Sequence, residues 1–263
     1  MLKKLLKYDL NGIYKILVIF YGLSLFFAIL TRIFLSVDNS FIMDVIGKIC
    51  SGVTISMMFN ILVNNVLRLL IRFKNNFYGD ESYLTHTLPV EKKTLYLSKT
   101  LSSVISLFTS ALVICITLFV AYYSKENIQF VKGLLLPLAA VYDSTIVIIL
   151  LEFILICFLE IMNMVQSGYV GIVLGHKQNN SKFGFSLLFG FVTYLMTQAF
   201  TLLIVFITAL FNKELMNLFF TIDTLNVSTI KVCIYLALLV YTLNILILYF
   251  INTRLFSNGV NVD

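Results

Sequence analysis

Charged residues are scarce in this chain of 263 residues, and proline is almost absent. Asp, Glu, Lys and Arg make up 12% of the residues and there are 2 prolines, whereas 60% are hydrophobic and 24 are Phe. A soluble domain carries about 25% charged residues, with which it covers its surface. The composition therefore excludes a soluble enzyme and a disordered or collagen-like chain, and it predicts a multi-pass membrane protein.

Sequence motifs of catalytic and metal sites are missing as well. There is no G-x-x-x-x-G-K-[ST] phosphate loop, no H-E-x-x-H and no G-x-S-x-G motif. The four cysteines form no C-x-x-C pair, and the two histidines, His86 and His176, lie far apart in the sequence. We therefore expect no enzyme activity, no metal and no cofactor on this chain. The net charge of +6 comes from basic residues between apolar runs, which indicates membrane topology rather than a nucleic-acid partner.

Six apolar segments are long enough to cross the hydrocarbon core, which takes about 20 helical residues. They lie near residues 13–35, 45–71, 95–122, 142–174, 184–211 and 230–253. The residues before the fourth segment, 126–141, are apolar too. Pro137 and Asp143 interrupt the continuous apolar stretch, so we interpret 126–141 as a separate segment at the outer face. The predicted fold is an all-α integral membrane protein with a single transmembrane domain over residues 1–263.

Lysine and arginine are distributed unevenly between the two sides that six spans define. With the N-terminus inside, the cytoplasmic segments hold 13 basic residues: Lys3, Lys4, Lys7, Lys15, Arg68, Arg72, Lys74, Lys92, Lys93, Lys99, Lys177, Lys182 and Arg254. The outer segments hold 6: Arg32, Lys48, Lys125, Lys132, Lys213 and Lys231. Because the cytoplasmic side carries the basic excess in membrane proteins, we expect both termini in the cytoplasm.

Two segments on the predicted cytoplasmic side carry further information. Residues 1–12, MLKKLLKYDLNG, place leucines and lysines on different faces, which is typical of an amphipathic helix in the membrane interface. The loop over residues 72–94 joins the second and third spans. There, Gly79 ends a helix, Asp80 is expected to cap a short helix over 80–87, and Pro89 is expected to start the next one. Such a helix exposes Tyr83 and Leu84, and two exposed apolar side chains on a polar loop suggest a protein partner.

The stretch GDESYLTHTLPVEKKTLYLSKTL, residues 79–101, resembles the first cytoplasmic loop of type-2 ATP-binding-cassette (ABC) exporter permeases, in particular the small permeases of Gram-positive bacteria. The amphipathic N-terminus and the six spans are similar to that family too. In the family, the short loop helix is the coupling helix that docks on a separate ATPase subunit. One position departs from the commonest pattern, since Ser82 stands where a glycine often follows the acidic residue.

The resemblance implies a role for individual residues of the loop. Asp80, Glu81, Tyr83 and Leu84 would lie on the coupling helix, Leu88, Pro89 and Val90 would form the turn into span three, and Lys99 would lie near the cytoplasmic membrane edge. It also implies partners: an ABC ATPase subunit that carries ATP and Mg, and a second permease, identical or paralogous, in the bacterial plasma membrane. The family's cargo includes antimicrobial peptides, drugs and lipid-linked molecules.

Polar residues inside the spans are candidates for a translocation path. Asn60 and Asn64 belong to a polar ridge on span two, and Glu152, Glu160 and Asn163 lie within one arc of span four. Polar ridges also serve helix packing, but an ionisable Glu160 near the bilayer middle costs about 2.5–3.5 kcal/mol and usually faces a cavity or a partner. Gly171 and Gly175 form a G-x-x-x-G motif, which marks either close helix packing or a flexible exit into the loop.

Two other classes of function stay open on these residues. A proton-coupled secondary transporter would use Glu152 or Glu160 and would need no ATPase. A membrane-bound sensor or immunity protein would bind a peptide without moving it.

Overall fold

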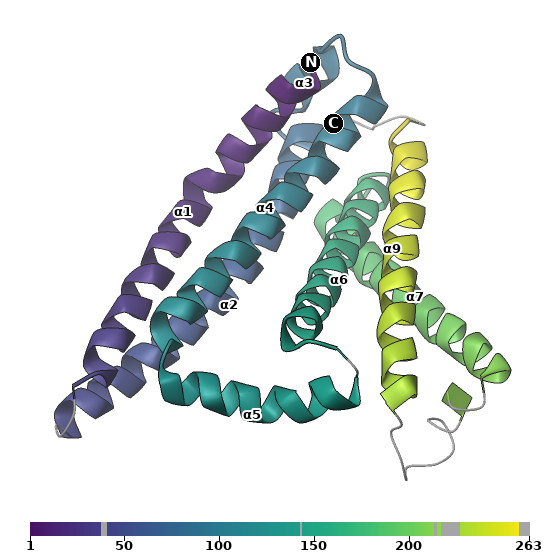
Figure 1. The fold of residues 1–263 in the computed structure, drawn as a ribbon. Coiled ribbons are helices and arrows are strands. Elements are labelled where there is room, and N and C mark those ends of the chain that lie inside the picture. The colour runs from purple at the N-terminus through teal and green to yellow at the C-terminus, as the bar shows by residue number, and fades with distance from the viewer. Residues whose placement is uncertain (38–40, 143, 213–214, 217–226, 258–263) are drawn as a thin grey trace. The chain divides into compact units, whose positions relative to one another are not determined.

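The computed structural model describes residues 1–37, 41–142, 144–212, 215–216 and 227–257, and every regular element among them is a helix (Figure 1). Asp143 and Lys213 lie outside the described residues. Six helices are long and apolar enough to cross a membrane: α1 (Leu2–Leu35), α2 (Phe41–Tyr78), α4 (Lys92–Tyr122), α6 (Ile146–Gly175), α7 (Lys182–Phe211) and α9 (Val227–Ser257). The six predicted spans are confirmed, and the protein is a multi-pass helical membrane protein.

The chain forms two compact units, Met1–Phe130 and Val131–Asp263, which we describe separately. Helix α5 (Lys125–Val141) begins in the first unit and ends in the second. It corresponds to the apolar stretch 126–141, and Pro137 lies inside it. Its 17 residues are fewer than the about 20 that a straight crossing needs, so it is not one of the six spans.

In the first unit α1 and α4 run parallel, and α2 runs antiparallel to both. Contacts between α1 and α4 advance together along both helices, from Asp9 with Lys99 to Ser24 with Thr117. Contacts of α2 run the other way, because Ser51 bonds Tyr122 and Asn65 bonds Ser106. The start of α1, the end of α2, the start of α4 and the intervening short helix α3 (Ser82–Thr87) therefore share one end of the unit.

Serines on α4 form the centre of the first unit. Ser98, Ser102, Ser106 and Ser110 recur every four residues, and all are buried. Asn65 of α2 donates to the Ser106 carbonyl at 2.9 Å and to the Ser110 hydroxyl at 2.7 Å. Small polar residues allow membrane helices to approach closely and to form hydrogen bonds with one another, so this serine ridge explains how three apolar helices associate.

Two local expectations about the helix ends differ from the structure. Residues 2–12 are not a separate helix, because α1 continues through Gly12 without a break to Leu35. Helix α3 starts at Ser82, later than predicted, and neither Asp80 nor Glu81 caps it with a side-chain hydrogen bond. The turn closes instead through the backbone, with the Ser82 amide donating to the Gly79 carbonyl at 2.9 Å.

Helix α4 likewise starts later than the sequence suggested. Pro89 stays in the extended turn, and α4 begins at Lys92 after Glu91.

In the second unit α6 and α7 run antiparallel, because Glu160 bonds Gln198 whereas Gly171 lies against Gly190. Helices α6 and α9 run parallel, because Glu160 interacts with Tyr241 and Gln166 bonds Asn252. Helices α6 and α7 touch through their backbones. A Cβ added at Gly171 would collide with the backbone of Gly190 and Ser186, and one added at Gly175 would collide with Ser186. The G-x-x-x-G motif is therefore a close helix contact rather than a flexible exit.

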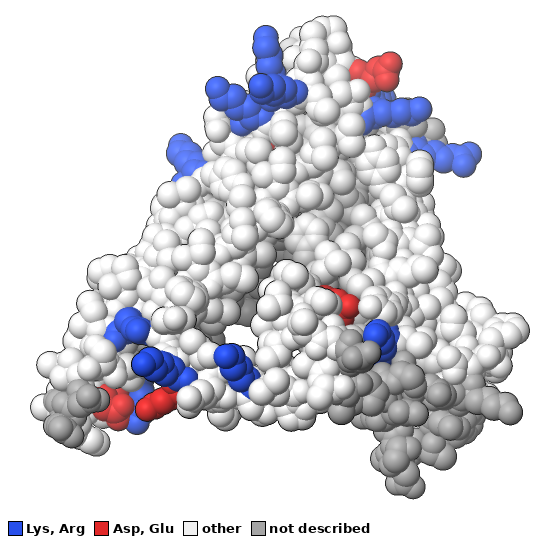
Figure 2. Space-filling view, in the orientation of Figure 1, with Lys and Arg blue, Asp and Glu red and all other residues white. Residues whose placement is uncertain are grey.

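Charged side chains of the first unit gather at the two ends of its helices, and the surface between them is mostly white in Figure 2. On α2, residues 49–67 carry no Asp, Glu, Lys or Arg. These 19 residues span about 28 Å of helix, close to the thickness of a bilayer hydrocarbon core. Lys48 and Arg68 thus mark the two polar boundaries of the span on this helix.

Candidate functional site

The loop between α2 and α4 contains the short helix α3, and its two apolar residues point outward. Tyr83 is 75% exposed and Leu84 is 69% exposed, whereas Ser82 on the same helix is buried. His86 lies on the inner side, where its Nε2 is 3.2 Å from the carbonyl oxygen of Phe77. One face of α3 is thus attached to the end of α2, and the other face is free to contact a partner.

A buried group of charged and polar residues lies at the same end of the first unit as α3. We call it the Asp9 cluster, and it consists of Asp9, Arg72, Asn76, Ser98 and Lys99. Asp9 on α1 is 2% exposed and Lys99 on α4 is 7% exposed, and their Oδ1 and Nζ atoms are 2.5 Å apart.

Asp9 is the common acceptor of the cluster. The Ser98 hydroxyl donates to it at 3.0 Å, the Asn76 amide at 3.2 Å, and the Arg72 Nε lies 3.5 Å away. A buried carboxylate is tolerated only with such donors and countercharges around it. The Asp9 cluster therefore connects α1, α2 and α4 at the end of the unit that carries α3.

Arg72 and Tyr8 extend the cluster to the loop before α3. The Arg72 guanidinium lies 4.8 Å from the centre of the Tyr8 ring and donates to the Tyr8 carbonyl at 3.0 Å. Gly12 leaves the space for this, since a Cβ there would collide with the guanidinium. The Tyr8 hydroxyl in turn points to Glu81 at 3.4 Å, so the residue before α3 faces the first helix.

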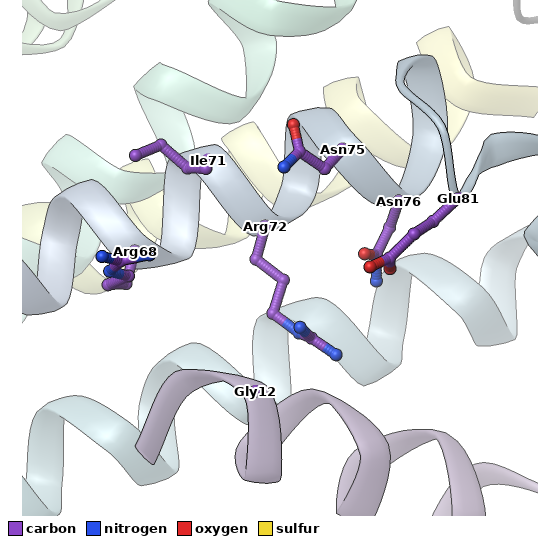
Figure 3. Close-up of a pocket in the computed structure, with 7 residues that line it drawn as sticks. All are labelled: Gly12, Arg68, Ile71, Arg72, Asn75, Asn76 and Glu81. Carbon is purple, nitrogen blue, oxygen red and sulfur yellow. The ribbon is translucent and has the colours of Figure 1, made fainter. Parts of the chain in front are cut away.

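Two cavities flank this region. The larger, of about 400 Å³, lies between the start of α1, α3 and the start of α4, and Leu5, Leu84, Leu88 and Leu95 give it an apolar wall. The smaller, of about 90 Å³, is lined by polar groups of α2 and the loop, as Figure 3 shows: Gly12, Arg68, Ile71, Arg72, Asn75, Asn76 and Glu81.

The predicted coupling residues divide into two groups. Asp80, Tyr83, Leu84, Leu88 and Pro89 are exposed around α3, whereas Glu81 is half-buried against α1. Lys99, which we expected near the cytoplasmic membrane edge, is buried in the Asp9 cluster.

The sequence analysis missed Asp9, Asn76 and Ser98. One signal for Asp9 was present, since it is the single acid within an N-terminal segment that is otherwise basic and apolar.

No protein-family model, no curated protein and no solved structure matches the chain. The candidate sites therefore depend on their own geometry. Among the residues that the structure describes, no three or more His, Cys, Asp or Glu side chains come together as metal ligands do.

The second unit contains a polar group around Glu160, midway along α6. The Tyr194 hydroxyl donates to Glu160 Oε1 at 2.5 Å and the Gln198 amide donates to it at 2.8 Å. Tyr241 of α9 also interacts with this carboxyl group, whose other oxygen is buried without a hydrogen bond. Among the residues that the structure describes, no Lys or Arg forms an ion pair with it, in contrast to Asp9.

The other predicted path residues lie in different surroundings. Asn163 donates to the Thr197 hydroxyl at 2.9 Å, and one oxygen of Glu152 is buried without a hydrogen bond. In the first unit, Asn60 and Asn64 donate to the carbonyls of Ser56 and Asn60 in their own helix. The structure thus places Glu160 and Asn163 on the face of α6 that contacts α7.

Proposed function

We propose that this chain is the membrane-spanning permease subunit of an ATP-driven exporter of the ABC type, with α3 as its coupling helix. The observation that supports this most directly is the position of α3. It presents Tyr83 and Leu84 to the outside, while its His86 contacts the end of α2, at the same end of the unit where the Asp9 cluster connects three spans.

The contacts around α3 suggest how force would pass into the membrane. A displacement of α3 acts on α2 through His86 and Phe77, and on α1 through Glu81 and Tyr8. Because the Asp9 cluster connects these helices to α4, all three would move together rather than slide past one another. Rigid displacement of spans is what a transporter needs to change the side to which its path is open.

In this proposal the chemistry takes place on a partner. A separate ATPase subunit binds ATP and Mg and contacts Tyr83 and Leu84, with Asp80 beside them. Leu88 and Pro89 form the turn that leads from α3 to α4. A second permease, identical or paralogous, completes the path, and the cargo is an amphipathic molecule such as an antimicrobial peptide, a drug or a lipid-like compound.

The double variant Tyr83→Ala, Leu84→Ala tests the proposal. We expect that the ATPase subunit no longer co-purifies with this variant, although the variant still inserts into the membrane, since the two side chains form the exposed apolar surface of α3. Losing two such anchors reduces affinity by about 30-fold or more.

A matched control is available at the other end of the first unit. Phe41 and Ile42 are adjacent, apolar and similarly exposed, at 81% and 67%. Their double alanine variant should keep the ATPase. Co-purification that survives the change at Tyr83 and Leu84 argues against the coupling role.

The group around Glu160 favours a second candidate function, a proton-coupled secondary transporter. A carboxyl group in the middle of a span, surrounded by hydroxyl and amide donors and without a basic partner among the described residues, is suited to gain and lose a proton. This function predicts transport in proteoliposomes that contain no ATPase and its loss in Glu160→Gln. Transport that requires the ATPase and persists in Glu160→Gln excludes it.

A further inference from the structure

Arg68 lies where α2 leaves the hydrocarbon core. It follows the uncharged residues 49–67, which span about 28 Å, so its guanidinium reaches the level of the lipid phosphates. Long basic side chains at helix ends extend toward this level. The depth of Arg68 therefore does not depend on which side of the membrane this end faces.

Arg68 has no partner within the part of the chain that the structure describes. It makes no hydrogen bond or ion pair there, and the same is true of the side chain of Asn75, two turns further along α2. Both line the small cavity of about 90 Å³, and half-exposed Ile71 lies between them. Figure 3 shows Arg68 at one end of this cavity and Glu81 beside Asn76 at the other.

The remaining charges of the cavity are engaged elsewhere. Arg72 donates to the Tyr8 carbonyl and faces Asp9, and Glu81 receives the Tyr8 hydroxyl. Among the described residues, the lining of the cavity thus includes two unpaired donor groups, the Arg68 guanidinium at one end and the Asn75 amide two turns further along α2. Guanidinium and amide groups both donate to the oxygens of a phosphate group.

We propose that Arg68 and Asn75 form a binding site for a phosphate group, supplied by the headgroup of an anionic phospholipid. Basic pockets between membrane helices bind anionic headgroups in this way. The site is independent of the proposed export function, because it uses neither α3 nor a partner subunit. Inorganic phosphate has the same chemistry and is the other source that the experiment distinguishes.

The chain contains no tryptophan, which allows a direct measurement. The variant Ile71→Trp places a single fluorophore in the wall of the cavity, at a position exposed enough to accept it. The full chain is reconstituted in phosphatidylcholine that contains increasing fractions of phosphatidylglycerol brominated near the glycerol end of its chains. Quenching reports the binding of that lipid relative to brominated phosphatidylcholine.

We expect phosphatidylglycerol to bind about fivefold more tightly than phosphatidylcholine in the Ile71→Trp chain. In the chain that carries both Ile71→Trp and Arg68→Gln, we expect the two lipids to bind with the same affinity. Lys7→Gln is the control, because Lys7 is an exposed basic residue of α1 at the same end of the first unit as Arg68, and it lies outside the cavity. Its preference for phosphatidylglycerol should not change. Native mass spectrometry of the chain without tryptophan gives a second reading, with retained phosphatidylglycerol lost in Arg68→Gln.

Inorganic phosphate is then added at constant ionic strength, with chloride as the reference. A lipid site keeps its quenching, whereas displacement by phosphate alone assigns the site to the free anion. The proposal is overturned if both lipids quench equally in the Ile71→Trp chain, which keeps Arg68, and phosphate has no effect. A preference that survives Arg68→Gln overturns it as well.

Discussion

At the scale of single residues, Asp9 contributes most clearly to the structure. Its carboxylate is buried among donors from α2 and α4, and it neutralises Lys99, which is buried too. Removing one member of a buried ion pair is far more costly than removing both, because the other charge stays in a medium that does not solvate it.

We therefore expect Asp9→Asn to lower the free energy of unfolding by about 3–5 kcal/mol, measured as a loss of thermal stability in detergent. Asp44→Asn is the matched control, since Asp44 pairs with Lys48 at 2.7 Å but both side chains are exposed. An exposed pair contributes about 0.2–1 kcal/mol. Equal losses in the two variants would show that burial does not determine the contribution of Asp9.

The asparagines of α2 show what sequence patterns reveal about single residues and what they leave open. Asn60 and Asn64 stand out by their four-residue spacing, yet Asn65 is the one that bonds across to α4. Neighbouring residues differ by about 100° around a helix. The face that contacts a partner depends on where α4 lies, and that is not a local property of α2.

At the scale of elements, the spans and α3 were predictable because their signals are local. Twenty apolar residues specify a span, and Gly79 and Pro89 delimit a short helix between two of them. The Asp9 cluster was not predictable, because Asp9 and Lys99 are 90 residues apart in the sequence. The serine ridge had a visible four-residue spacing, but nothing in α4 alone shows that α1 and α2 pack on it.

The contact between α6 and α7 leads to a test at this scale. Gly171→Ala should destabilise the protein by about 1–3 kcal/mol, because its Cβ would collide with the backbone of Gly190 and force the helices apart. Thermal unfolding in detergent measures this.

Gly22→Ala in α1 serves as the reference, since nothing lies within 4 Å of the Cβ that it adds. It should be neutral or stabilising by up to about 1 kcal/mol, because alanine is the better helix former. A Gly171→Ala chain as stable as Gly22→Ala would mean that α6 and α7 are not in backbone contact.

At the scale of the whole molecule, the orientation in the membrane is the property that remains a prediction. The first unit places the start of α1 and helix α3 at the same end, and the distribution of 13 against 6 basic residues predicts that this end is cytoplasmic.

Impermeant maleimide tests this orientation on a chain in which the four native cysteines are replaced by serine. Lys7→Cys and Tyr83→Cys should be labelled in inside-out vesicles and protected in intact cells. Lys125→Cys, expected on the outer side, should react in intact cells. Labelling of Tyr83→Cys from outside would contradict both the orientation and the coupling role.

The distance in sequence between Asp9 and Lys99 also constrains how the protein is made. Asp9 is synthesised 90 residues before Lys99, which corresponds to about 5–18 s of translation. During that time Arg72 of the second span is made, but the shorter ion pair of Asp9, the one with Lys99, cannot yet form. Native docking of these helices therefore cannot be completed before the third span emerges, and the order of synthesis determines when this half of the protein acquires its final form.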